Sequence, residues 1–285
     1  MGGLFFFLGT PVCLLALSKN AIINGMQTAY PIILVHGLAV RDCIFMKPFG
    51  QIERKLKEEG FVVSRSKVEA FAPIEHNAEV LKKEILKILE ENNVDKVNII
   101  AHSKGGLDAK YMIEKLDMAE HVASFTTMCT PHKGTPVARG VAKLPRWMLH
   151  VMAFFVNLWY RILGDRHPNS LKSLEQLASW NPVEEVILKA GSGIYCQSYS
   201  ATLERSRDDF VLGIPLAFCH HVEKGEPSDG LVSKESAKFG EYKGLMLEGS
   251  ISHSDVFDFM AKKNKKERIY GFYSTLCEDL KNRGF

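Results

Sequence analysis

One serine lies where its surroundings favour activation as a nucleophile. Residues 101–106 read AHSKGG, directly after the apolar run VNII and before LDAKYMI, which has helical spacing. This pattern is typical of a sharp turn from a strand into a helix, with the serine hydroxyl exposed at the turn. Ala101 and Gly105 supply the small side chains that such a turn requires, because larger ones would collide across it. We therefore predict that Ser103 is a nucleophile rather than an ordinary serine in a strand–helix turn.

A serine nucleophile needs a base, and the base needs an acid to orient it. In turns of this kind the acid and then the histidine follow the serine along the chain. His253, in GSISHSDVF, follows the strand-like residues 245–247 and is the late histidine in that setting. Asp229, in EPSDGLV, lies in a polar turn before an apolar pair. We predict Asp229 as the acid, in preference to Asp208 and Asp209 of the charged run ERSRDD.

The other histidines fit the role of base less well. His102 lies inside the turn and is expected to point away from the partner of Ser103. His132, in TPHKGTP, follows a predicted strand but precedes the acid in the sequence. We expect His36 to shape a loop beside the site. The remaining histidines are expected to be solvated or structural: His76, His121, His150, His167, His220 and His221.

Attack on a carbonyl also requires two backbone donors for the oxyanion. One is expected to be the N–H of Lys104, the residue after the nucleophile, at the start of a helix. The other is expected from the loop HGL after the first strand, where Gly37 allows close approach of the backbone. We predict that this second donor is the N–H of Leu38.

These residues are spaced along an alternation of strands and helices. Short apolar runs predict strands at 30–35, 61–63, 96–101 and 122–128, and helical spacing predicts helices at 52–59, 78–92 and 105–116. Such alternation predicts an α/β fold: a mostly parallel central sheet with helices on both faces. Reactive residues then gather at the carboxyl ends of the strands. We predict a single domain over residues 30–285.

An apolar segment, 137–163, interrupts this alternation. Its residues are apolar almost all round a helix, which fits either a buried helix pair or a lid over an apolar pocket. Because long insertions in compact domains are usually functional, we predict a helical lid insertion at about 137–180. Basic residues flank it and fit either an anionic membrane surface or ordinary solvated charge. The predicted substrate contacts are Trp147, Val151, Phe155 and Trp159; the flanking residues are Lys143, Arg146 and Arg161.

Composition excludes several classes of protein. The chain has 285 residues, 46% of them apolar and 24% charged, which excludes a disordered chain. A net charge of +3 is too small to argue for nucleic acid as a partner. The six cysteines form no CxxC pair, and they are too few in this length for a disulfide framework. Composition indicates neither a cofactor nor an oligomeric state.

We predict that residues 1–29 are an apolar leader or anchor. The uncharged run LFFFLGTPVCLLAL is too short to span a membrane but matches the core of a signal peptide, although no basic residue precedes it. A hairpin or helix packed on the body is the alternative. A secreted or membrane-associated location is slightly favoured, and a cytoplasmic one stays open.

Several motifs together resemble the bacterial true lipases, which are α/β-hydrolases that cleave acylglycerols. YPIILVHGLA, VNIIAHSKGG, TPHKGTPVA, NSLKSLEQL, DGLVS and SHSD occur in this order between Tyr30 and Phe259. The resemblance implies a triad of Ser103, Asp229 and His253, oxyanion donors at Leu38 and Lys104, and a mobile lid at the apolar insertion. It implies a lipid ester as substrate, bound at an interface, with peripheral membrane contact possible.

The resemblance also raises the question of a structural calcium ion, although the chemistry itself requires no cofactor. Many such lipases hold calcium through an aspartate two residues after the catalytic histidine, which is Asp255 here, and another upstream of the acid, which is Asp208 or Asp209. The other ligand positions are not recognisable. Some relatives also carry a disulfide near the acid, and no cysteine lies close after Asp229. A short-chain carboxylesterase, a phospholipase, an acyltransferase and a non-catalytic lipid-binding protein remain alternatives.

Overall fold

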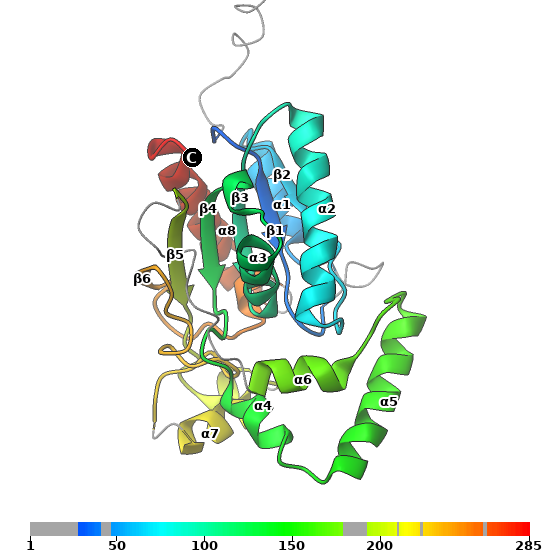
Figure 1. Cartoon of the computed structure of the whole chain (residues 1–285). Coiled ribbons are helices and arrows are strands. Elements are labelled where there is room, and N and C mark those ends of the chain that lie inside the picture. Colours follow the sequence, from blue (N-terminus) through cyan, green and yellow to red (C-terminus); the bar gives the residue numbers. More distant parts are fainter. Residues whose placement is uncertain (1–27, 41–46, 179–192, 210, 223–224, 259–260) are drawn as a thin grey trace, which may run out of the picture.

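The computed structural model describes residues 28–40, 47–178, 193–209, 211–222, 225–258 and 261–285. Within them six parallel strands form one sheet in the order β2-β1-β3-β4-β5-β6 (Figure 1). The chain adds β2 on one side of β1 and then crosses to β3 on the other side. The carboxyl ends of β1 and β3 therefore lie side by side at the point where the strand order reverses, which is where α/β sheets bind ligands. The strands are β1 (Ile32–Val35), β2 (Val63–Arg65), β3 (Val97–His102), β4 (Val122–Met128), β5 (Tyr195–Ser200) and β6 (Glu241–Leu245).

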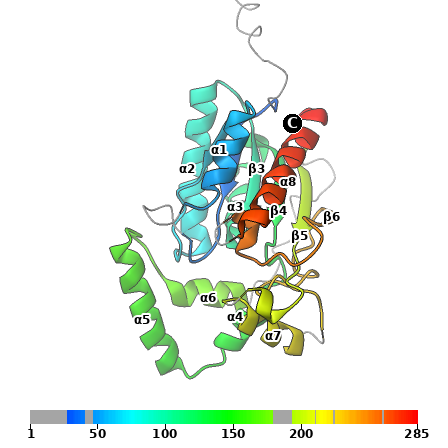
Figure 2. The same ribbon diagram turned by 180° about the vertical axis from the view of Figure 1, so that it is seen from behind.

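Helices cover both faces of the sheet. Helices α2 (Ile74–Asn92) and α3 (Lys104–Lys115) lie on one face, and α1 (Gly50–Glu58) and α8 (Lys263–Asn282) lie on the other (Figures 1 and 2). The remaining helices gather beyond the carboxyl ends of the strands. They are α4 (Pro136–Val141), α5 (Arg146–Ile162), α6 (Ser170–Ala178) and α7 (Gly213–Val222). Short 3-10 turns are η1 (Ala119–His121), directly before β4, and η3 (Ser206–Asp208) and η4 (Asp255–Phe257).

The apolar run IILV explains why β1 is central. Successive side chains of a strand point to opposite faces. Ile32 and Leu34 pack in the cluster that contains α1 and α8 residues such as Ile52 and Tyr273. Ile33 and Val35 pack in the opposite cluster, with residues of α2 and α3. A strand buried on both faces reads as a continuous apolar run, so both cores depend on this strand.

The predicted alternation matches the observed elements. The prediction of 122–128 coincides with β4, and the other predicted strands and helices lie within a few residues of β1, β2, β3, α1, α2 and α3. Residues 245–247 differ: β6 ends at Leu245, so that run begins where the strand ends. Strand β5, with the sequence YCQSYS, was not indicated by the sequence pattern. Its buried Gln197 donates from Nε2 to Thr126 Oγ1 of β4 at 3.0 Å, so side-chain hydrogen bonds help to fix this strand.

Segment 137–163 forms most of α4 and all of α5, and it is not a buried helix pair. In α5 only Leu149 is buried, and Trp147 and Ile162 are each 70% exposed. Helix α5 lies between α4 and α6 in the chain and stands away from the sheet (Figure 1). Tyr160 near its end donates from its hydroxyl to Ala39 O at 2.7 Å. Among the described helices, none has both the length and the hydropathy of a membrane span. The predicted leader, apart from residues 28 and 29, and the end of the predicted insertion, 179–180, lie outside the described residues.

Candidate active site

Ser103 occupies a strained turn between β3 and α3. Its backbone has φ 56° and ψ −134°, a region that non-glycine residues adopt only when the surrounding structure enforces it. The Ser103 N–H donates to Met128 O of β4 at 3.0 Å, and the Gly106 N–H donates to Ser103 O at 3.0 Å. A Cβ on Gly105 would lie 2.4 Å from His36 O, so only glycine lets α3 start against the end of β1. The local packing therefore forces the predicted turn.

The structure brings Ser103, His253 and Asp229 together in hydrogen-bonding order. His253 Nε2 lies 2.9 Å from Ser103 Oγ, and His253 Nδ1 lies 2.6 Å from Asp229 Oδ2. The backbone N–H of His253 also donates to Asp229 O at 2.9 Å, so the two loops are joined twice. All three side chains are buried, with Ser103 the most accessible at 9%. An imidazole held in this way can take the hydroxyl proton from the serine.

Asp229 is held by its own turn and lies close to Cys129. The backbone N–H groups of Leu231 and Val232 donate to Asp229 Oδ1 at 2.9 and 2.8 Å, which leaves Oδ2 for the imidazole. Burial, reinforced by the nearby Asp229 carboxylate, raises the pKa of the Cys129 thiol well above its ordinary value. Cys129, Asp229 and His253 place possible ligand atoms within 4.8 Å of one another. A thiol kept protonated is a poor metal ligand, so this cluster is better suited to proton transfer than to metal binding.

The predicted oxyanion donors lie beside Ser103. Lys104 is the first residue of α3, and the first N–H groups of a helix have no acceptor within the helix. A Cβ on Gly37 would lie 3.0 Å from Ser103 Oγ, which places the loop that contains Leu38 against the serine. Both N–H groups therefore belong to segments that contact Ser103, at the positive end of a helix dipole. Their role as oxyanion donors stays a prediction.

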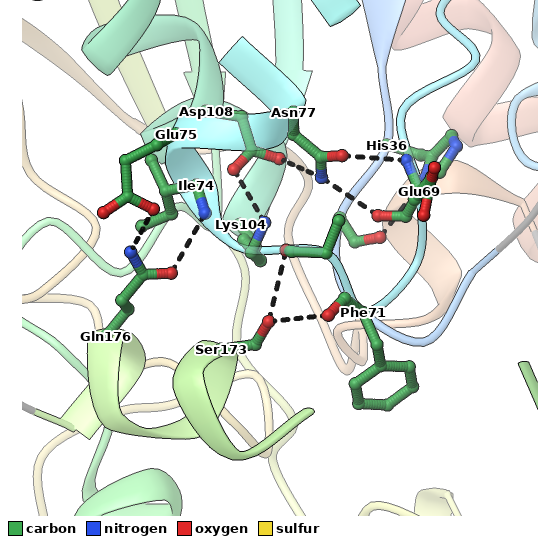
Figure 3. Close-up of polar contacts among 12 residues, drawn as sticks. His36, Glu69, Phe71, Ile74, Glu75, Asn77, Lys104, Asp108, Ser173 and Gln176 are labelled. Atoms are coloured by element: carbon green, nitrogen blue, oxygen red, sulfur yellow. Dashed lines mark hydrogen bonds and ion pairs between the residues drawn. The ribbon is translucent and has the colours of Figure 1, made fainter. Parts of the chain in front are cut away.

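The side chain of Lys104 is part of a buried polar network that no sequence pattern indicated. Lys104 Nζ donates to Asp108 Oδ1 at 2.7 Å, and Asn77 Nδ2 donates to Asp108 Oδ2 at 3.0 Å (Figure 3). Burial raises the pKa of Asp108 to about 6, although the Lys104 ammonium opposes the shift. Asn77 also donates to Glu69 O and accepts from the Glu69 N–H. The residue after the nucleophile is thereby tied to α2 and to the β2–α2 connection.

His102 does not point away from the partner of Ser103, contrary to expectation. Its ring centroid lies 4.4 Å from that of His253 and 4.8 Å from that of Phe257. The His102 ring therefore packs against the His253 imidazole. Burial lowers the pKa of His102 well below its ordinary value, with smaller contributions from His253 and His36. A neutral ring at this place does not repel the charge that His253 acquires on taking a proton.

An apolar cavity of about 140 Å³ lies between α4, α5, α6 and the loop that contains Leu38. Helix α5 turns Leu149, Met152, Ala153 and Val156 toward it. The four predicted substrate contacts are not among the residues that line it. They lie instead on the exposed part of α5: Trp147, Val151, Phe155 and Trp159. Because this helix is apolar almost all round, the sequence alone did not indicate which side faces the cavity.

Two of the predicted calcium ligands, Asp255 and Asp209, already accept hydrogen bonds from other groups of the chain. Asp255 Oδ2 accepts from Lys265 Nζ at 2.7 Å and from the Ser252 N–H at 3.1 Å, so an ammonium already neutralises it. Asp209 Oδ1 accepts two N–H groups of its own loop, and Asp208 joins no potential metal cluster among the described residues. Calcium takes six to eight oxygen ligands, so calcium binding at these aspartates stays a prediction.

The chain is similar in sequence to proteins described as esterases and lipases. Residues 29–162 match the family described as "Putative serine esterase (DUF676)". The chain is 28% identical to "Triacylglycerol lipase 2" of Saccharomyces cerevisiae over 262 residues, which cover 82% of this chain and 73% of the yeast protein. It is 37% identical to a triacylglycerol lipase of Vibrio cholerae over 119 residues, which cover 40% of this chain and 38% of that lipase.

Solved structures show the same fold. A metagenomic carboxyl esterase superposes with a TM-score of 0.64 at 16% identity, covering 88% of this chain and 75% of the esterase. A Bacillus licheniformis lipase in its mature form superposes with a TM-score of 0.61 at 17% identity, covering 87% of this chain and 91% of the lipase. The predicted α/β-hydrolase fold is thus confirmed. The function of α5 as a lid stays a prediction.

Proposed function

The chain is a carboxylic ester hydrolase with the α/β-hydrolase fold, and on this premise we propose that it hydrolyses acyl esters of lipids through Ser103, His253 and Asp229. The observation that carries the proposal is the hydrogen-bonded series from Ser103 Oγ to His253 Nε2 and from His253 Nδ1 to Asp229 Oδ2. Ser103 lies at a strained turn, and backbone strain of this kind costs stability and is concentrated at functional sites. No metal or cofactor takes part in the proposed chemistry.

In the acylation step, Ser103 Oγ attacks the ester carbonyl carbon while His253 Nε2 takes the hydroxyl proton. Asp229 accepts the Nδ1–H of His253, which fixes the tautomer and stabilises the imidazolium that forms. The carbonyl oxygen becomes an oxyanion and accepts from the N–H groups of Leu38 and Lys104. When the tetrahedral intermediate collapses, His253 gives its proton to the departing alcohol oxygen, and an acyl-serine remains.

In the deacylation step, water replaces the alcohol. His253 Nε2 takes one proton from water while the water oxygen attacks the acyl-serine carbonyl carbon. Collapse of the second intermediate breaks the bond to Ser103 Oγ, which regains its proton from His253. The products are a carboxylic acid and the regenerated enzyme.

Lipid esters are favoured over small polar esters by the surroundings of the site. The cavity beside Leu38 has apolar walls, which suit an acyl chain. The exposed face of α5 is a large apolar patch of the kind that marks an interaction site: Trp147, Val151, Phe154, Phe155, Leu158, Trp159 and Ile162. We propose that this face of α5, a lid over the cavity, rests on the lipid surface, with the exposed Lys143, Arg146 and Arg161 beside anionic headgroups.

Hydrolysis of p-nitrophenyl esters with acyl chains from C2 to C16, and of an emulsified triacylglycerol, tests this function. The wild type is expected to cleave esters with a maximum at C8 or longer, and Ser103→Ala to lose activity. A maximum at C2 to C4 with no triacylglycerol cleavage would contradict the lipid substrate while keeping the esterase. Product analysis with added alcohol separates hydrolysis from acyl transfer. If the folded wild type cleaves none of these esters, the proposal is wrong.

A further inference from the structure

A second cluster of ionisable side chains contains none of the triad residues. Glu69 is in the connection between β2 and α2, His76 is in the first turn of α2, and His167 is in the connection between α5 and α6. One ligand atom from each of the three side chains lies within 4.8 Å of the other two. The proposed ester hydrolysis uses none of them. We propose that these three residues bind a divalent transition-metal ion, with Zn²⁺ favoured, which fastens α5 and α6 to the body.

The distances within the cluster are compatible with metal ligation, although His167 Nδ1 is also within hydrogen-bonding distance of Glu69 Oε1 and the two imidazole rings lie 4.2 Å apart. Glu69 Oε1 lies 3.4 Å from His76 Nε2 and 3.2 Å from His167 Nδ1. A charge-assisted N–H···O⁻ bond is shorter, about 2.7–2.9 Å. Ligands at about 2.0–2.1 Å from a tetrahedral zinc ion are separated by about 3.3–3.4 Å, as the edges of a tetrahedron. Both measured separations lie at or close to that edge length, so small movements of the side chains would complete the site.

The carboxylate of Glu69 is oriented for this role before any ion arrives. Its Oε2 accepts from the backbone N–H groups of Arg166 and His167, at 3.1 and 2.8 Å, which leaves Oε1 turned toward the imidazoles. Asn77 holds the backbone of Glu69 through two hydrogen bonds of 2.9 Å (Figure 3). Hydrogen bonds that orient a ligating carboxylate are a regular feature of metal sites, because they reduce the ordering needed on binding.

The donor set selects the class of ion. Two imidazole nitrogens and one carboxylate oxygen suit Zn²⁺, Co²⁺ or Ni²⁺, whereas Ca²⁺ and Mg²⁺ prefer sites made of oxygen ligands. Three protein ligands leave a fourth position for water. Because the ligands come from both the body and the α5–α6 connection, a bound ion would join segments that are 98 residues apart in the sequence. The structure therefore assigns the ion a stabilising role at the base of α5, separate from ester chemistry.

Calorimetric titration of the full chain with ZnCl₂ or CoCl₂, after treatment with a chelator and desalting, tests the site. We expect one equivalent to bind, and each of His76→Ala and His167→Ala to weaken binding by at least about tenfold. His150→Ala is the matched control, because His150 is an exposed histidine of α5 outside the cluster, and its affinity is expected to equal that of the wild type. CaCl₂ is expected not to bind at the same concentrations.

Two further readouts keep the outcome unambiguous. The bound Co²⁺ is expected to lack the strong near-ultraviolet absorption of cobalt–thiolate bonds, which separates this site from the cysteines of the chain. Zn²⁺ is expected to raise the Tm of the wild type and not that of His167→Ala, whose side chain is 58% exposed and so is not needed for folding. Equal affinity in all variants, thiolate absorption, or no binding by the folded wild type would each overturn the proposal. None of these readouts depends on esterase activity.

Discussion

Substitution of Gly37 tests whether the loop after β1 supplies an oxyanion donor to the site. A Cβ added there would lie 2.6 Å from Ser103 Cβ, 3.0 Å from Ser103 Oγ and 3.1 Å from His102 O. Carbon atoms in contact are normally about 3.5–4.0 Å apart, so the alanine overlaps the serine by roughly 1 Å. Gly37 is not among the glycines with positive φ, so contact rather than backbone strain decides the outcome. The loop must retreat, and it carries the N–H of Leu38 with it.

The expected cost falls mainly on catalysis. Loss of one oxyanion donor lowers kcat by about 10²–10³-fold, equivalent to roughly 3–4 kcal/mol in the transition state. Overpacking by one methyl group costs about 1–3 kcal/mol of folding stability. Gly37→Ala is therefore expected to fold, with a lowered Tm, and to cleave a p-nitrophenyl ester at least about 10²-fold more slowly than the wild type at a temperature well below its Tm.

Gly271→Ala is the matched control for this experiment. Its added Cβ meets no heavy atom within 4 Å, and Gly271 lies inside α8, which contributes no residue to the triad. This substitution is expected to stabilise the fold by about 0.5–1 kcal/mol and to leave kcat unchanged. If folded Gly37→Ala keeps kcat within a factor of about three of the wild type, the reasoning that this loop supplies an oxyanion donor is refuted.

Four other predictions follow from the same contacts. Asp229→Asn is expected to lower kcat by about 10³–10⁴-fold in the same assay, because the imidazole loses its orienting acceptor; a loss below tenfold would contradict the triad. Burial raises the pKa of Glu84 to about 7, so the wild type loses stability as the pH rises from the ordinary value of 4.5 toward 7. Glu84→Gln is therefore expected to have the higher Tm at pH 8, with the difference shrinking toward pH 4, and an equal difference at both values would refute this assignment. Iodoacetamide at pH 8 is expected to leave Cys129 unmodified in the native protein and to alkylate it after unfolding, as peptide mass spectrometry would show, because burial raises its pKa; native alkylation would mean that the thiol is accessible. Phe155→Asp is expected to weaken sedimentation with anionic vesicles while leaving cleavage of a soluble C4 ester intact, and unchanged sedimentation would exclude this face of α5 as the lipid contact.

Much of the site was predictable because its residues are fixed by short-range patterns. The turn around Ser103 needs small residues at fixed offsets between a strand and a helix, and these are visible in the sequence. Asp229 and His253 were identified because each lies in a loop with the expected setting and order. Their mutual distances, in contrast, depend on loops that meet only after the sheet has formed.

The features that the sequence did not indicate arise from tertiary packing. The polar side chains of strand β5 are buried and form hydrogen bonds with neighbouring strands. The hydropathy of its sequence therefore does not indicate a buried strand. The contact of His102 with His253 and the Lys104–Asp108–Asn77 network join elements that are distant in the chain. The cavity-facing side of α5 was not predictable either, since a helix that is apolar almost all round has no periodic face to detect.

Covalent labelling tests the central claim, that Ser103 is the nucleophile, most directly. The chain is incubated with diethyl p-nitrophenyl phosphate, and the modified peptide is identified by mass spectrometry while residual esterase activity is followed. We predict one diethylphosphoryl group, on Ser103, with activity lost in proportion to labelling, and no label in Ser103→Ala. A label on another residue that accounts for the inactivation, or full esterase activity in Ser103→Ala, would contradict the account.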